Sequence, residues 1–349
     1  MARKVAGPHK LGHYRAMATT ATDEVDGGGL LRIGVSKCLL GAKVRFDGQH
    51  KRDGFLMDVL APYVQWIAVC PEVEVGMSIP RPIVRLQQNA AGRTLMVAPD
   101  SGTDWTDRME AFSQERTAKL QAEDLDGYVL KRSSPSCGME RVKLYPAPGK
   151  SADKSQPTKD GVGLFAASLL AAMPNLPIEE EGRLQDAVLR ENFIERLFTY
   201  KRLKALWAQR WNVGSLVRFH TAHKLTLMAH SPQAYSTLGR LVATAQSIPP
   251  AELRAQYERE FMAALQKNAT PGRHANVMQH MIGYLRPHLE ETDKQELATL
   301  IDDHRKGQVP LVVPLTLLKH HIRRHKIEYL QGQTYLDPHP KELMLRNRV

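Results

Sequence analysis

Three short apolar runs in the first half of the chain each lead into a cysteine, and the 349 residues contain no other cysteine. The runs are Leu31–Ser36, Val64–Val69 and Gly127–Leu130, and the cysteines that follow them are Cys38, Cys70 and Cys137. Each run has the length of a strand. Stretches with helical character, residues 51–60 and 107–124, lie between the runs. Strands that alternate with helices predict a parallel sheet with crossover connections.

From about residue 178 the pattern changes, because strand signals nearly vanish. Apolar side chains then recur at helical spacing, as at Leu184, Val188, Phe193 and Leu197. We therefore predict an α/β domain over residues 30–176, a Rossmann-like parallel sheet with flanking helices, and an all-α domain over residues 177–349. Residues 1–29 have the composition of a loose extension, and Met17 is an alternative start. A loop is expected at residues 146–160, before a closing helix.

The composition is typical of a globular protein, with 42% hydrophobic and 24% charged residues. The most apolar stretch, residues 164–173, is about half as long as a membrane span, so we expect no membrane insertion. The N-terminus lacks the apolar segment of a secretory signal. An odd count of three cysteines does not suggest a disulfide framework, and a reducing cytoplasm fits best.

The positive charge is unevenly distributed along the chain. Residues 181–349 contain 25 Lys and Arg against 16 Asp and Glu, while the first 180 residues are nearly balanced. A basic half beside a neutral half suggests that the helical domain meets a polyanion such as nucleic acid. A solvated basic surface without a partner explains the charge equally well. The basic residues that we assign to an RNA-binding face are Lys201, Arg202, Lys204, Lys224, Arg323, Arg324 and Lys326.

Each cysteine taken alone is best explained as a small buried hydrophobic residue. Together they suggest more, because the carboxyl ends of parallel strands are where open α/β sheets place their chemistry. The separations of 32 and 67 residues exclude local zinc-finger and ferredoxin spacings. An iron–sulfur cluster and a zinc ion rank equally on these grounds, and a lone catalytic cysteine ranks third. Three ligands would leave one metal position open for substrate.

The residues around the cysteines carry a specific three-part pattern. It consists of 30–41 with Arg45-Phe46-Asp47-Gly48, then Val69-Cys70-Pro71-Glu72-Val73-Glu74 through Pro80-Arg81-Pro82, then Ser133-Ser134-Pro135-Ser136-Cys137-Gly138. This pattern, over most of residues 30–175, resembles the thiouracil desulfidase (TudS-like) family. Residues 185–345 look like the helical domain often fused to it, and the two-domain arrangement resembles desulfidases of 4-thiouridine in transfer RNA. Lys37 departs from the family, where many members have alanine.

The resemblance implies a 4Fe–4S cluster held by Cys38, Cys70 and Cys137, with one iron lacking a protein ligand. A thiocarbonyl sulfur is soft and would bind that iron, which would act as a Lewis acid while water attacks the carbon. The product would be a uracil-like carbonyl and sulfide, without net electron transfer.

The resemblance also implies two catalytic side chains. Glu72 matches the family's catalytic glutamate and is expected to act as general acid and base. Ser134 matches the family's functional serine and would position water or relay a proton. From residue type alone, Glu72 would be a turn or N-cap carboxylate and Ser134 a turn hydroxyl. Weaker candidates to shape the pocket are Arg45, Asp47, Glu74, Arg81 and Lys131.

Two features of the helical half have both a structural and a functional interpretation. His220 and His223 lie on one helix face, where packing or phosphate contact is favoured over half of a metal site. Aromatic side chains could stack on unpaired bases, although core packing is the better explanation for most. These are Tyr200, Trp207, Trp211 and Tyr235.

The sequence therefore supports one leading function and three alternatives. The leading hypothesis is a cluster-dependent desulfidase of 4-thiouridine in transfer RNA, which would be the main partner. The alternative enzyme acts on free thiouracil or its nucleosides, small thiolated pyrimidines for which the helical domain would be structural. A cluster-bearing RNA-binding or sensor protein without turnover is a different class, and a zinc-dependent hydrolase with the same thiols is the last.

Overall fold

The computed structural model describes residues 29–147 and 156–349. The predicted N-terminal extension and possible start at Met17 therefore fall almost entirely outside the described residues. The three predicted strands are present with the predicted bounds as β1 (Leu31–Ser36), β2 (Val64–Val69) and β6 (Gly127–Leu130). They form a four-stranded sheet of order β2-β1-β6-β9, and all its neighbouring strands are parallel. The predicted parallel α/β fold is confirmed.

The fourth strand, β9 (Ile178–Glu180), pairs with β6 and lies beyond residue 176, where the sequence places the end of the α/β domain. All three residues of β9 are buried. The predicted all-α range of residues 177–349 thus begins with a strand that completes the sheet. This strand is too short to stand out by its pattern, since three residues show no clear alternation.

A second sheet was not predicted. Its strands, in the order β5-β4-β3-β7-β8, are β3 (Arg85–Gln88), β4 (Thr94–Ala98), β5 (Thr103–Asp104), β7 (Val142–Tyr145) and β8 (Thr158–Gly161). Strand β8 lies at the end of the stretch expected to be a loop. These strands have two to five residues and mix charged with apolar side chains. They depend on their neighbours more than on their own sequence.

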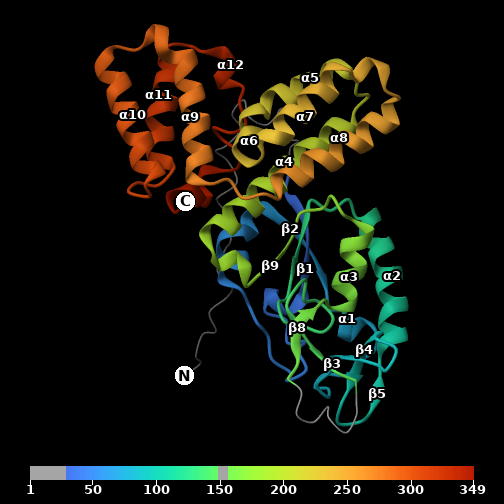
Figure 1. The fold of residues 1–349 in the computed structure, drawn as a ribbon. Coiled ribbons are helices and arrows are strands. Elements are labelled where there is room, and N and C mark those ends of the chain that lie inside the picture. Colours follow the sequence, from blue (N-terminus) through green and yellow to red (C-terminus); the bar gives the residue numbers. More distant parts are fainter. Residues whose placement is uncertain (1–28, 148–155) are drawn as a thin grey trace, which may run out of the picture.

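Two helices cover one face of the first sheet (Figure 1). They are α2 (Thr106–Ala122) and α3 (Leu164–Ala172). Leu120 of α2 and Phe165 of α3 pack with Tyr128 and Leu130 of β6 in one buried cluster. The helix predicted at 107–124 is therefore confirmed within two residues. The stretch 51–60 forms only a short π-helix, Phe55–Leu60, followed by a 3₁₀ turn.

The opposite face is covered by α4 (Ala187–Ala208), the first long helix of the basic half. Its Phe193, Ile194 and Leu197 pack against Ile33 and Val35 of β1. The approach is close enough to require glycine at position 127, where a Cβ atom would lie 2.1 Å from Leu197 Cδ2. Because α4 fills the core of the sheet, the α/β and helical parts share this helix.

The rest of the helical part forms two lobes above the sheet in Figure 1. The first contains α5 (Val213–Ala222), α6 (Lys224–His230), α7 (Pro232–Ala243) and α8 (Pro250–Leu265). The second contains α9 (Pro271–Leu285), α10 (Glu291–Arg305), α11 (Val312–Arg324) and α12 (Glu328–Gln331). None of the described helices has both the length and the apolar character needed to span a membrane.

Candidate active site

The three cysteines lie at one edge of the parallel sheet. Cys38 is in the 3₁₀ turn Lys37–Leu40 that follows β1, Cys70 caps helix α1 (Pro71–Glu74) after β2, and Cys137 is in the loop after β6. Strands β2, β1 and β6 are neighbours and parallel, so their carboxyl ends meet. The prediction that the topology brings these residues to the same edge is confirmed.

All three thiols line one cavity of about 220 Å³. Glu72 and Ser134, the two predicted catalytic residues, line the same cavity. Its further lining includes Arg45, Phe46, Arg81, Ile83, Lys131, Arg132 and Ser136. The cavity thus combines soft sulfur donors with a carboxylate, hydroxyls and several cations.

The cysteine side chains sit in surroundings that oppose a free thiolate. Burial raises the pKa of Cys38 to about 11, with a further contribution from Cys70, while Lys131 and Arg45 act in the other direction. Burial likewise raises the pKa of Cys70 and, more strongly, that of Cys137. A bound cationic group would reverse this balance, because a metal favours deprotonated sulfur.

The donor set fits a cluster better than a single metal ion. Within residues 29–147 and 156–349, no three His, Cys, Asp or Glu side chains are grouped closely enough to hold one ion. The three thiols come from three different segments of the chain that line one cavity. A group with several metal atoms can reach separate points, and three thiolates without a fourth cysteine leave one of its metals open.

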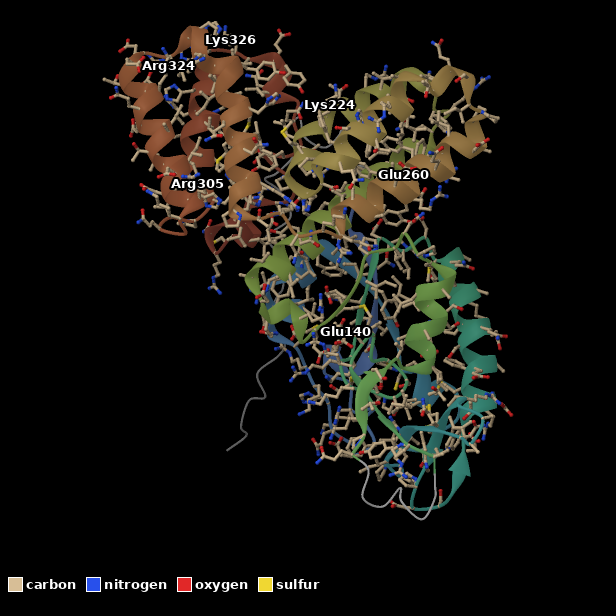
Figure 2. The ribbon with its side chains drawn as sticks, viewed as in Figure 1. Glu140, Lys224, Glu260, Arg305, Arg324 and Lys326 are labelled. Carbon is tan, nitrogen blue, oxygen red and sulfur yellow. The ribbon has the colours of Figure 1, made fainter. Side chains whose placement is uncertain are left out.

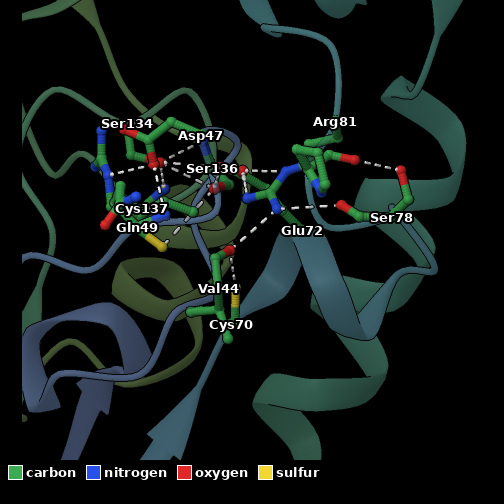
Figure 3. Close-up of polar contacts among 12 residues, drawn as sticks. Val44, Asp47, Gln49, Cys70, Glu72, Ser78, Arg81, Ser134, Ser136 and Cys137 are labelled. Atoms are coloured by element: carbon green, nitrogen blue, oxygen red, sulfur yellow. Dashed lines mark hydrogen bonds and ion pairs between the residues drawn. The ribbon is translucent and has the colours of Figure 1, made fainter.

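Glu72 is held at both carboxylate oxygens (Figure 3). Arg81 forms an ion pair with Oε2, with its Nε at 2.9 Å, and the Arg81 side chain is only 5% exposed. Oε1 accepts hydrogen bonds from Ser136 Oγ at 2.7 Å and from Ser134 Oγ at 3.3 Å. Arg81 Nη1 also donates to the Val44 carbonyl at 3.0 Å, which fixes the guanidinium. The carboxylate is thereby aimed at the two hydroxyls.

The two serines connect Glu72 to the Cys137 loop. Ser134 Oγ lies 3.0 Å from Ser136 Oγ and accepts the backbone N–H of Cys137 at 3.2 Å. Ser136 is completely buried, and its hydroxyl lies 3.7 Å from Cys137 Sγ. Sequence reasoning singled out Ser134 and missed Ser136, which makes the shorter bond to Glu72. The signal available was a second serine beside a cysteine in the same loop.

The weaker pocket candidates divide into two groups. Arg45, Arg81 and Lys131 line the cavity. Asp47 instead pairs with Arg45 at 3.4 Å. Glu74 accepts the backbone N–H of Cys70 at 2.9 Å and pairs with Arg116 at 3.1 Å. Asp47 and Glu74 therefore support residues of the cavity wall rather than face the cavity.

Two of the residues assigned to an RNA-binding face, Lys201 and Lys204, contact the α/β part, and a third, Arg202, is buried within the helical part. Lys204 pairs with Asp124 at 3.0 Å and Asp126 at 2.9 Å, at the start of β6. Lys201 donates to backbone carbonyls that precede β1, including that of Leu30 at 3.3 Å. Arg202 is a correction: its side chain is buried and donates to the Pro338 carbonyl at 2.8 Å, so phosphate cannot reach it.

The other four assigned residues lie on the two lobes, and Figure 2 labels three of them, Lys224, Arg324 and Lys326. Arg323, Arg324 and Lys326 are exposed at the end of α11, and Lys224 is half-buried at the start of α6. These four remain candidates for contact with phosphate.

The two histidines of the helical half serve packing. The His220 and Tyr257 side chains are hydrogen-bonded at 3.1 Å, and the His223 ring stacks on Phe219 with centroids 4.1 Å apart. Trp207 is buried against Trp211 and Tyr257. The favoured packing interpretation of these side chains agrees with the structure.

Matches to known protein families divide the chain into two regions that are close to the two domains predicted from the sequence. Residues 33–181 match the family model of 2-thiouracil desulfurase, and residues 224–340 match DUF1722, a family of unknown function. The uncharacterized protein YbgA of Escherichia coli K12 is 35% identical over 153 residues, which cover 44% of this chain and 90% of YbgA. A solved structure of the [4Fe-4S]-dependent thiouracil desulfidase TudS is 28% identical, with a TM-score of 0.34, and covers 44% of this chain and 93% of its own.

Proposed function

We propose that this chain, whose residues 33–181 match the 2-thiouracil desulfurase family and whose residues 224–340 match DUF1722, is an iron–sulfur-dependent desulfidase that converts 4-thiouridine in transfer RNA to uridine. The observation that carries the proposal is one cavity lined by three thiols from neighbouring strand ends and by a carboxylate held at both oxygens. The reaction replaces a C=S bond by C=O, so water supplies the oxygen and sulfur leaves as hydrogen sulfide, without redox change.

Cys38, Cys70 and Cys137 would hold the cluster in this proposal. When bound, such a group supplies an iron without a protein ligand, a soft Lewis acid suited to a thiocarbonyl sulfur. The apolar surface of Phe46 and Ile83 in the same cavity offers a place for the face of a pyrimidine ring.

Glu72 is positioned to handle the protons of the reaction. Its Oε1 would take a proton from the attacking water, directly or through a serine hydroxyl, and return it to the departing sulfur. Ser134 and Ser136 both donate to Oε1, at 3.3 Å and 2.7 Å, so either hydroxyl can pass a proton between the cavity and the carboxylate. Arg81 on Oε2 keeps the carboxylate turned toward the serines.

The RNA substrate is supported by charge. Residues 181–349 carry a net charge of +9. The exposed end of α11 presents Arg323, Arg324 and Lys326. Such surfaces bind the phosphate backbone in a salt-dependent manner. The thiolated base would have to swing out of its stack to enter the cavity.

Free thiouracil is the second candidate substrate, and one observation favours it. Every residue that lines the cavity belongs to residues 36–137, so the cavity is complete without the helical lobes. Lys201 and Lys204 also form contacts with the α/β part, and Arg202 is buried within the helical part.

The deciding experiment gives both substrates to the anaerobically prepared, cluster-loaded protein. Bulk transfer RNA is incubated, digested to nucleosides and analysed by mass spectrometry for 4-thiouridine, while free 4-thiouracil is followed by its absorbance. Loss of 4-thiouridine with sulfide release supports the proposal. Loss of 4-thiouracil alone transfers support to the second candidate. If neither substrate is converted, the RNA-binding or sensor protein is favoured. If metal analysis finds zinc and no iron, the zinc-dependent hydrolase is favoured.

A further inference from the structure

A second hollow, a groove of about 520 Å³, adjoins the cysteine cavity. Four residues line both: Ile83, Val84, Ser133 and Pro135. The groove is therefore continuous with the cavity at the loop that carries Cys137. Its other walls come from β3, β7 and β8 of the second sheet, which Figure 1 places away from the helical lobes.

Three cations form a row across the strands of this groove. Leu86 of β3 and Leu144 of β7 are register partners and both are buried. Arg85 and Lys143, which precede them, therefore share the opposite face on neighbouring strands. Lys159 of β8 lines the same groove. The pairing of β7 with β8 is irregular between Val142 and Leu144, where Lys159 and Asp160 both lie opposite Lys143.

The row has no acidic counterpart. Among the described residues, no carboxylate lies within 4.0 Å of the charged groups of Arg85, Lys143 or Lys159, whereas neighbouring Arg141 lies 3.9 Å from Glu140. Asp160 follows Lys159, but its carboxylate accepts the Thr158 hydroxyl instead. Like charges in adjacent positions across strands are destabilising. A row of this kind is consistent with an anion that binds there and offsets the repulsion.

Arg85 is already held in a fixed position. Its guanidinium lies over the Tyr145 ring, 4.5 Å from the centroid, and Nη2 donates to Gln87 at 3.1 Å. Its buried Nε has no hydrogen-bond partner among the described residues. A planar cation that is stacked on a ring and only partly buried suits an anion.

We propose that this groove binds the phosphate backbone of the nucleotides next to the base that occupies the cysteine cavity. The inference rests on the proposed function, and it makes the α/β domain itself an RNA-binding surface. A row that crosses three strands, about 4.8 Å apart, suits a chain of phosphates better than a single ion. A thiolated nucleotide within a polynucleotide would thus be held at two places, its base at the thiols and its backbone at the cations.

The test compares two charge-neutralised proteins of equal net charge. K143Q/K159Q removes two cations of the row, and K119Q/K306Q removes two exposed lysines that already pair with Glu115 and Asp302. Fluorescence anisotropy with labelled bulk transfer RNA, at several salt concentrations, gives the affinity. We expect K143Q/K159Q to bind at least about tenfold more weakly near 0.1 M salt, with the salt slope reduced by about 1 to 2.

Charge-conserving K143R/K159R is expected to keep the affinity, which separates loss of charge from loss of fold. The ratio of turnover on transfer RNA to turnover on 4-thiouracil should also fall for K143Q/K159Q. If K143Q/K159Q has the same affinity and salt slope as K119Q/K306Q, the proposal that this groove binds phosphates is wrong. If the unaltered protein converts neither substrate, the proposed function is wrong instead. The comparison of binding affinities would still show whether the groove binds the RNA backbone.

Discussion

Two of the buried groups of charged side chains can be compared, one at the cysteine cavity and one where α4 meets the C-terminal segment. In the second, which we call the α4 network, Glu191 pairs with Arg346 at 3.0 Å and Glu195 with His230 at 3.1 Å. Its side chains are 2–8% exposed, and it joins α4, α6 and the end of the chain. At the cavity, Glu72 is 13% exposed and faces three thiols across open space.

The two groups differ in what satisfies their charges. Burial opposes the charge of Glu191, yet His339 and Arg346 outweigh it and lower the pKa of that carboxyl. Every strong interaction of the α4 network is with another protein group that the fold brings to it. At the cavity, Arg81 neutralises one oxygen of Glu72, while the other oxygen accepts hydrogen bonds from two serine hydroxyls. Strong perturbation of charged groups therefore does not identify a functional site unless the groups also face a cavity.

The largest effect is expected from Cys38→Ala, which removes one of the three thiols. The cluster would lose a ligand, so iron and sulfide content after anaerobic preparation should collapse and desulfuration should become undetectable. Chemical analysis of iron and sulfide checks the first, and sulfide release checks the second. Retention of the full iron content and activity would show that Cys38 is a packing residue.

Glu72→Gln is expected to reduce turnover by about 10²- to 10⁴-fold, the usual contribution of a general acid or base. Iron content should stay unchanged, because the thiols are intact. Glu74→Gln is the matched control, since Glu74 lies two residues away and supports Cys70 without lining the cavity. Equal losses in the two variants would indicate damage to the α1 turn and not the loss of a proton carrier.

These sites could be predicted in part because strand ends follow simple rules. Continuous apolar runs identified β1, β2 and β6, and adjacency of their carboxyl ends brought Cys38, Cys70 and Cys137 together. The contact of Arg81 with Glu72 could not be predicted from the sequence, because it depends on how residues nine positions apart fold back on each other. Arg202 was misassigned because a basic run suggests exposure, whereas the packing of α4 turns this side chain inward. The second sheet was missed because its strands are stabilised mainly by their partners.

Arg346→Met tests the α4 network as a structural element. Leaving Glu191 buried without its partner should lower the free energy of unfolding by about 3–5 kcal/mol. Urea denaturation measures the loss, and turnover of 4-thiouracil per folded molecule should be unchanged. The double variant Glu191→Leu/Arg346→Met should recover part of the stability, because the Glu191 charge is removed and Glu195 keeps its pair with His230. A double variant less stable than the single one would contradict this account.

Acidification should act on the histidines of the helical part before it reaches the carboxylates. Burial, aided by nearby cations, lowers the pKa of His220 to about 4 and the pKa values of His223 and His274 to about 3. These rings are neutral in the fold but become charged in the unfolded chain below pH 6.5. Their stabilisation is complete above pH 6.5 and declines by up to about 1.4 kcal/mol per pH unit for each as the pH falls.

His230 opposes this trend. Burial disfavours its charge, but Glu195 outweighs burial and raises the pKa of His230, so its pairing stabilises the fold below pH 6.5 and fades at higher pH. Between pH 6.5 and 4.5 His230 is charged in both states and its contribution is constant, so His220, His223 and His274 alone predict a loss of up to about 4 kcal/mol per pH unit. Burial also lowers the pKa values of His304 and His321, which act in the same direction. Urea denaturation at half-unit steps of pH checks the slope. Replacing His223 by Phe, which can keep the stacking on Phe219, should make the slope shallower, and an unchanged slope would exclude His223 as a source.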